Sequence, residues 1–164
     1  MLNPFVLEDW GKFLEHADGG AVKLPAKPLV GRSASPAVCD ALVFFGATGD
    51  LAYKKIFPAL HNMIQHKTLN VPVIGVAKAG WTLDQLRERA AASIKEYGAP
   101  VDGPFFRRLV ELMQYIDGDY QDPATFAQLR KVLGGATHPA HYLAIPPVLF
   151  STVVEGLGRS GCVG

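Results

Sequence analysis

The chain has 164 residues, 49% of them hydrophobic and 19% charged, with a formal net charge of +1 at pH 7. This composition indicates one packed domain and excludes a disordered chain. The near-neutral charge provides no global field for nucleic acid or acidic membranes, and no apolar run approaches the roughly 20 residues that span a bilayer.

The N-terminus has neither a basic start nor a long apolar stretch, so it does not resemble a secretory signal. Cys39 and Cys162 are far apart and lack metal-ligand spacing, which favours reduced thiols. We therefore expect a cytoplasmic protein with no nucleic-acid partner, no membrane partner and no bound metal.

Residues 1–38 differ from the rest, because glycines, prolines and small polar residues interrupt them without a sustained period. We predict a mobile N-terminal leader over residues 1–38, with one short helix near residues 5–15. The folded domain is then expected over residues 39–164.

From residue 41 onward, strand and helix patterns alternate along the chain. Thr82 and Asp122 are placed to begin helices, and Gly98 and Gly134 to end them. Pro58 lies inside the first helix, where its missing N–H should bend the helix or leave a ragged first part. The predicted strands are residues 41–45, 71–77, 113–116 and 141–145, and the predicted helices are residues 50–66, 82–97, 104–112, 123–133 and 147–157.

This alternation predicts an α/β fold with a mainly parallel sheet and right-handed crossovers. Ligands of such sheets bind beyond the carboxyl ends of the strands. Gly46, Lys78 and Pro146 each follow a predicted strand, so we expect all three at the same edge.

The stretch Gly46-Ala47-Thr48-Gly49 comes between the first strand and the first helix. Gly46 allows a tight turn, and Gly49 lacks a Cβ where a pyrophosphate would approach. Backbone amides at a helix N-terminus attract phosphate, so we expect the amides of residues 46–49 to hold a diphosphate. The spacing matches neither a Walker motif nor the full G-x-G-x-x-G fingerprint. Asp50 follows the loop, and we expect it to cap the helix, with a ligand contact as the alternative.

Lys78 ends the second strand, where dinucleotide sites that prefer NAD carry an acid for the ribose 2′-hydroxyl. A cation at this point can pair with a 2′-phosphate, which favours NADP, with NAD also possible. A solvated surface lysine is the other interpretation. Because lysine acts as a point charge without the fork of arginine, the preference is expected to be modest.

Two further positions bear on the cleft. Lys54 and Lys55 lie one turn into the first helix, where either could bind an anion, and we favour Lys55 for this role. The alternative is that both side chains are simply solvated. Pro146 offers a rigid edge against which a flat ring could pack, or it has a purely structural role. None of the five histidines has metal-ligand spacing, and we assign none of them a catalytic role.

The stretch Phe44-Phe-Gly-Ala-Thr-Gly-Asp-Leu-Ala-Tyr-Lys-Lys-Ile-Phe-Pro58 resembles the opening of glucose-6-phosphate dehydrogenases, whose signature is G-x-x-G-D-L-A-x-x-K followed by a proline. Three later segments resemble the exits of the family's second, third and fourth strands, in the same order. They are Ile74-Gly-Val-Ala-Lys78, Tyr115-Ile-Asp-Gly-Asp-Tyr-Gln-Asp122 and Tyr142-Leu-Ala-Ile-Pro-Pro147.

The resemblance implies a Rossmann-type doubly wound sheet that binds NADP or NAD and serves the oxidation of glucose 6-phosphate to 6-phosphogluconolactone. It places the pyrophosphate at residues 46–51 and the anionic substrate and cofactor cleft at Lys55. It also places a 2′-phosphate at Lys78, where the family usually has arginine. The pyrophosphate residues are Gly46, Ala47, Thr48, Gly49, Asp50 and Leu51.

The family's EKP and R-I-D-H-Y-L-G-K segments, which carry an essential lysine and the proton-accepting histidine, do not occur in these 164 residues. By this resemblance the sheet is incomplete at its C-terminus, and the domain that forms the family's dimer interface is absent. We therefore expect little or no turnover from this chain alone. A stand-alone nucleotide-binding or interaction module is the alternative. A short-chain reductase is a weaker one, because residues 146–164 hold no tyrosine for its catalytic pair.

Overall fold

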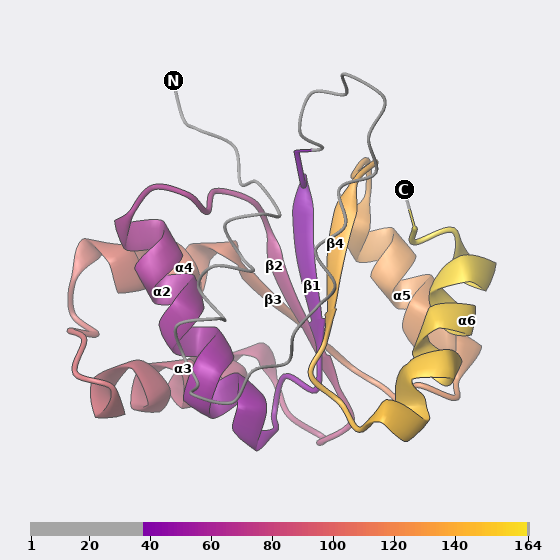
Figure 1. Ribbon diagram of the computed structural model, residues 1–164, viewed down its shortest axis with the longest axis horizontal. Helices are drawn as coiled ribbons and strands as arrows, with labels where there is room; N and C mark the ends of the chain where they lie inside the picture. The colour runs from indigo at the N-terminus through magenta and orange to yellow at the C-terminus, as the bar shows by residue number, and fades with distance from the viewer. Residues whose placement is uncertain (1–37, 164) are drawn as a thin grey trace, which may run out of the picture.

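The computed structural model describes residues 38–163, in which a four-stranded sheet lies between two layers of helices (Figure 1). The predicted leader and its short helix lie outside the described residues, apart from Val38. The strands are β1 (Ala41–Phe45), β2 (Val73–Ala77), β3 (Met113–Asp117) and β4 (Pro139–Leu143). The helices are η1 (Ala52–Ile56), α2 (Phe57–Gln65), α3 (Leu83–Glu96), α4 (Pro104–Leu112), α5 (Pro123–Leu133), η2 (Pro147–Leu149) and α6 (Phe150–Ser160).

The sheet has the order β3-β2-β1-β4, and all three pairings are parallel. The predicted α/β fold with a parallel sheet is therefore confirmed. The chain builds outward from β1 through β2 to β3 and then crosses back to place β4 on the other side of β1. The order reverses between β1 and β4, and a reversal of this kind opens a crevice at the carboxyl ends of the strands.

The core lies on both faces of β1, whose five residues are all buried. Leu42 and Phe44 belong to the cluster under α2, α3 and α4, and the Phe44 ring meets the Phe57 ring edge-on at 5.9 Å. Val43 and Phe45 belong to the cluster under α5 and α6. A strand buried on both faces reads as a continuous apolar run, as this one does.

The predicted helix 50–66 begins at Asp50, but its second turn is a π-helix over Ala52–Ile56. There the Phe57 N–H donates to the Ala52 carbonyl five residues back. Pro58 follows as the second residue of α2, where it has no N–H to continue the usual ladder. The sequence predicted that Pro58 would make the first part of this helix irregular, and the irregularity is a π-helical turn.

The fourth strand lies two residues earlier than predicted, at Pro139–Leu143 instead of 141–145. Among the strands of residues 38–163 it pairs with β1 alone, and Leu143 pairs with Phe45, the last residue of β1. After Phe45 the chain turns away at Gly46, which has a φ of +83°. The pairing with β1 therefore ends before Ile145 is reached. In the same region, the predicted final helix opens with the short η2 and continues as α6 to Ser160.

The predicted helix ends are largely confirmed. Thr82 caps α3 by accepting from the Gln85 N–H, and the Gln85 side chain accepts in return from the Thr82 N–H. Asp122 caps α5 through the Ala124 N–H, and Gly134 ends that helix with a φ of +56°. Among the described residues, no helix is long and apolar enough to cross a membrane.

We predict that Gly46→Ala lowers the free energy of unfolding by about 3 kcal/mol or more. A Cβ at this position would lie 2.1 Å from the Ala144 carbonyl oxygen, on a backbone whose φ is +83°. Gly98→Ala is the matched control, because Gly98 has the same φ but open space around it. It should cost only about 1 kcal/mol. Urea unfolding followed by circular dichroism measures both, and equal losses would rule out the clash with Ala144.

Candidate functional site

The carboxyl edge of the sheet, at the bottom of Figure 1, gathers the loops that follow the four strands. Gly46 follows β1, Lys78 follows β2, Asp119 lies just after β3, and Pro146 lies just after β4. As predicted, Gly46, Lys78 and Pro146 lie at the same edge. The sequence pattern did not single out Asp119 as a site residue.

The turn at Gly46 uses several of its own amides within the protein. The Gly46 N–H lies 2.9 Å from the Val76 carbonyl oxygen and 2.8 Å from the Tyr120 hydroxyl oxygen, and the Ala47 N–H donates to the same carbonyl at 3.3 Å. The Gly49 N–H donates to the Gly46 carbonyl at 3.0 Å. The expectation that the amides of all four residues 46–49 point toward a diphosphate is therefore wrong for Gly46, Ala47 and Gly49. Their hydrogen bonds hold the turn in shape.

The free amides lie slightly further along the chain. Within residues 38–163, the N–H groups of Thr48, Asp50 and Leu51 have no intramolecular acceptor, and the first bond of the helix runs from the Tyr53 N–H to the Gly49 carbonyl. These are the unpaired donors of a helix N-terminus, and they carry its partial positive charge. An anion placed over Gly49 would meet them.

Gly49 leaves open space in front of these amides. It is exposed, and a Cβ added there would have a single close neighbour, the Gly46 carbonyl oxygen at 3.4 Å. Packing of the described residues therefore does not require a glycine at this position. A ligand that needs close approach to the backbone is a physical reason for it.

Asp50 does not cap the helix as predicted, because no described side chain accepts from the first turn. Its carboxylate instead faces Arg89 of α3, with the Asp50 Oδ1 and Arg89 Nη2 atoms 4.0 Å apart. The Arg89 guanidinium also lies over the Tyr53 ring, 4.6 Å from its centroid, and 5.8 Å from the centroid of Trp81. Sequence reasoning missed Arg89, which ties the helix after β1 to the segment after β2.

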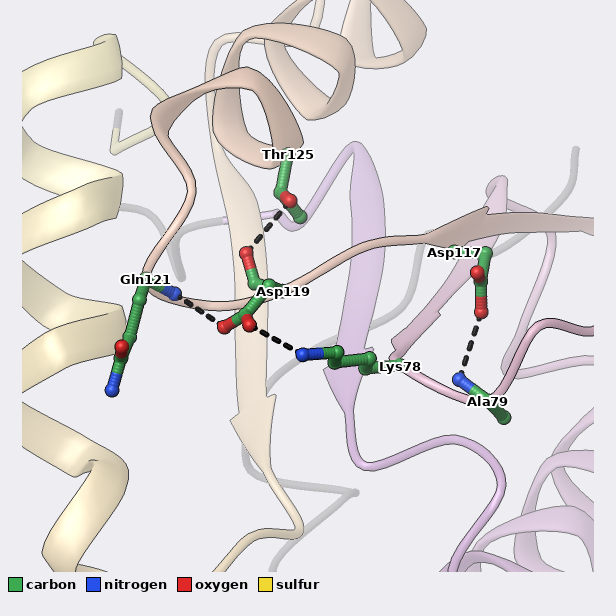
Figure 2. A network of polar contacts seen from close by, with 6 residues as sticks. All are labelled: Lys78, Ala79, Asp117, Asp119, Gln121 and Thr125. Atoms are coloured by element: carbon green, nitrogen blue, oxygen red, sulfur yellow. Dashed lines mark hydrogen bonds and ion pairs between the residues drawn. The ribbon is translucent and has the colours of Figure 1, made fainter.

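Lys78 extends from the end of β2 toward the loop after β3, where it meets Asp119 (Figure 2). The Lys78 Nζ atom donates to the Asp119 Oδ2 atom at 2.7 Å, and the Lys78 side chain is 71% exposed. The hydrogen bond from Lys78 holds the pKa of Asp119 below its usual range, and the same bond raises the pKa of Lys78. The ammonium is thus accessible to an anion but has a carboxylate partner in the free protein.

A second acid from β3 fixes the backbone next to Lys78. Asp117 Oδ1 accepts from the Ala79 N–H at 2.9 Å and the Gly80 N–H at 2.8 Å, and it also accepts from the Tyr115 hydroxyl at 2.8 Å. The hydrogen bond from Ala79 is the leading cause that lowers the pKa of Asp117. This loop therefore has a defined position even though it is exposed.

The two remaining predicted residues flank the same edge. Lys55 is half-buried within the π-helical turn. Pro146 is exposed, with a φ of −57°, and its carbonyl accepts from the Leu149 N–H at 2.9 Å to begin η2.

Comparison with known proteins identifies the family of this chain. Residues 43–164 match the family model described as "Glucose-6-phosphate dehydrogenase, NAD binding domain". The matched segment is most of the chain, and it contains every predicted site residue. This chain belongs to the glucose-6-phosphate dehydrogenase family.

Individual members of the family agree. Glucose-6-phosphate 1-dehydrogenase 1 of Mycobacterium tuberculosis is 39% identical over 120 residues, which cover 73% of this chain and 26% of that protein. A crystal structure of glucose-6-phosphate 1-dehydrogenase from Mycobacterium avium superposes with a TM-score of 0.71 at 42% identity, covering 74% of this chain and 27% of that one. A glucose-6-phosphate dehydrogenase solved in complex with its substrate glucose-6-phosphate gives a TM-score of 0.64 at 28% identity, covering 74% of this chain and 28% of that one.

The chain thus spans about a quarter of the length of these relatives, in the region of their NAD-binding domain. It has the Rossmann-type fold of the family's NAD-binding domain. Membership in this family supports a nicotinamide dinucleotide as the class of cofactor for this domain.

Tyr120 is a further contributor to this domain that the sequence pattern did not single out. Its hydroxyl oxygen accepts from the Gly46 N–H at 2.8 Å and lies 3.1 Å from the Val76 carbonyl oxygen. Its ring packs edge-on against Phe45 at 5.7 Å. Tyr120 therefore locks the end of β1 to the loop after β3, and burial raises its pKa.

Two of the described histidines contact other parts of the fold. His61 is buried in α2 against Phe105, and His141 of β4 bonds the Cys162 carbonyl through Nε2 at 2.8 Å. Burial lowers the pKa of both. The described residues contain no cluster of His, Cys, Asp or Glu that could hold a metal ion. A cavity of about 650 Å³ between α5 and α6 contains none of the predicted site residues.

We predict that Asp117→Asn reduces the loss in the free energy of unfolding that occurs as the pH falls below about 4. Because the pKa of Asp117 is lower in the folded state, its carboxylate stabilises the fold above its unfolded pKa of about 3.9 and loses that effect as the pH falls. The carboxylate is exposed, so the effect should be no more than about 1 kcal/mol.

Urea unfolding at about pH 6 and again near pH 3 measures this difference. Asp102→Asn serves as the control, because Asp102 is exposed and bonds no described residue. The same acid sensitivity in wild type and Asp117→Asn would contradict the assignment.

Proposed function

We propose that this chain binds NADP at the carboxyl edge of its sheet, with NAD as a weaker ligand, and is the coenzyme-binding part of a glucose-6-phosphate dehydrogenase. The observation that carries the proposal is the set of free amides at Thr48, Asp50 and Leu51 beside the open Gly49, at the end of β1. Donors at a helix N-terminus next to the topological switch point suit a pyrophosphate.

The residues take the following parts in this proposal. The loop from Gly46 to Leu51 holds the pyrophosphate, with Ala47 buried beneath it. Lys78 pairs with the 2′-phosphate that distinguishes NADP from NAD, Pro146 borders the nicotinamide side, and Lys55 faces the phosphate of the sugar.

The proposed reaction takes place in the cytoplasm, at the entry to the oxidative pentose phosphate pathway. A hydride leaves C1 of glucose 6-phosphate for the nicotinamide ring, the C1 hydroxyl loses its proton to a base, and 6-phosphogluconolactone forms. His61 is buried in α2, and the Nε2 atom of the half-buried His141 bonds the Cys162 carbonyl, so we assign neither side chain as that base. We therefore expect these 164 residues to bind the dinucleotide and to turn over little or no substrate.

Calorimetric titration of the chain with NADP and with NAD tests the 2′-phosphate assignment. Lys78→Ala should weaken NADP binding about five- to tenfold, because one charge-assisted contact is lost, while NAD binding changes less than twofold. Lys131→Ala is the matched control, since that exposed lysine lies near the far end of α5. Unchanged affinities for both nucleotides in Lys78→Ala would refute the role of Lys78.

A second substitution tests the pyrophosphate contact, which both nucleotides share. Gly49→Ala places a methyl group over the free amides and should weaken NADP and NAD equally, by about tenfold. The stability of the protein should change by less than about 1 kcal/mol, since the added Cβ meets only the Gly46 carbonyl at 3.4 Å. Binding that stays intact in a folded Gly49→Ala protein would place the diphosphate elsewhere.

A further inference from the structure

We propose that Asp119 sets the cofactor selectivity of this site, because its carboxylate forms an ion pair with the Lys78 ammonium to which we assign the 2′-phosphate. This inference rests on the proposed function, since it concerns how the same edge distinguishes NADP from NAD. Sites that prefer NAD carry an acid at the end of the second strand, where this chain has Lys78. In this inference Asp119, in the loop after β3, takes the role of that acid.

The Asp119 side chain is held in place more firmly than its partner. Its Oδ1 atom accepts from the Gln121 N–H at 2.9 Å, while its Oδ2 atom accepts from Lys78 at 2.7 Å. Its carbonyl accepts from the Thr125 hydroxyl at 2.7 Å (Figure 2). The same carbonyl accepts from the Asp122 N–H at 3.1 Å. Asp119 thus forms part of the turn into α5.

Lys78 is the movable member of the pair. Its side chain is 71% exposed, compared with 40% for Asp119, and its flexible stem allows the ammonium to turn toward another anion. The backbone beside it stays fixed, because Asp117 holds the Ala79 and Gly80 amides. A ligand can therefore redirect the ammonium without moving the loop.

The loop that carries Asp119 is also fixed against α5. A Cβ at Gly118 would lie 2.4 Å from the Thr125 hydroxyl oxygen, so the backbone there is packed closely on the first turn of that helix. We therefore expect Asp119 to keep its position when a nucleotide arrives, so that its carboxylate stays at this edge even if the ammonium turns away.

The two nucleotides meet this pair differently. A 2′-phosphate carries negative charge, so it must draw the ammonium away from Asp119 and then remain near a like charge, which weakens its binding. A ribose with a free 2′-hydroxyl can donate a hydrogen bond to the carboxylate and leaves the ion pair intact. Asp119 thus lowers the preference for NADP and supports NAD.

Asp119→Asn is the variant of choice, because the amide oxygen can still accept from the Gln121 N–H while the charge is removed. The ratio of NADP to NAD affinity, measured by calorimetry on the 164-residue chain, should rise about three- to tenfold. Glu111→Gln is the matched control. It breaks the exposed ion pair with Arg108 at 3.0 Å, just before β3 begins and so at the opposite edge of the sheet. It should leave the ratio unchanged.

A second measurement follows Lys78 directly in the wild-type chain and does not require a variant to fold. Acylation of lysines by a small anhydride, read by peptide mass spectrometry, should show Lys78 protected at least fivefold more by saturating NADP than by saturating NAD. In Asp119→Asn without nucleotide, Lys78 should react faster than in wild type, because the carboxylate that holds its proton is gone.

The outcomes separate the two proposals. A raised NADP-to-NAD ratio in Asp119→Asn, together with a lowered ratio in Lys78→Ala, supports the role of Asp119. An unchanged ratio in Asp119→Asn alongside a lowered one in Lys78→Ala overturns the role of Asp119 and leaves the proposed function standing. No binding of either nucleotide to the folded wild-type chain overturns the proposed function and the Asp119 inference with it.

Discussion

The turn at Gly46 is the constraint on which the rest of the site depends. Its positive φ takes the chain out of β1 directly against Ala144, and its N–H is held by the Val76 carbonyl and the Tyr120 hydroxyl. These contacts tie together the ends of β1, β2 and β4 and the loop after β3. The helix that follows can then begin at one place only, with its free amides above the switch point of the sheet.

Some charged groups at this edge are paired within the protein, and others remain accessible to a ligand. Asp117 Oδ1 accepts from the Ala79 and Gly80 amides, and Asp50 faces Arg89, so each carboxylate has a partner within the protein. The accessible donors are the amides of residues 48, 50 and 51 and the ammonium of Lys78. In the proposed function, local charges and dipoles at this edge attract the dinucleotide at short range, although the net charge of the chain is only +1.

Much of the fold followed from local patterns. The buried run at Ala41–Phe45, the capping box at Thr82 and the turn at Gly134 all lie where the sequence indicated. The π-helical turn before Pro58 and the early end of β4 were harder to predict from the sequence. The first is one of several ways in which a helix can accommodate a proline, and the second depends on where β1, a distant segment, turns away.

The sequence by itself determined the order of strands and helices, the glycine turn before the first helix and the family, because periodicity, caps and motifs are written in neighbouring residues. Only the tertiary structure decided which amides remain free and which acid meets Lys78. Tyr120 reaches Gly46 across 74 positions, and Asp119 reaches Lys78 across 41. Contacts at such separations depend on how parallel strands align and where their loops converge, and no local pattern specifies that.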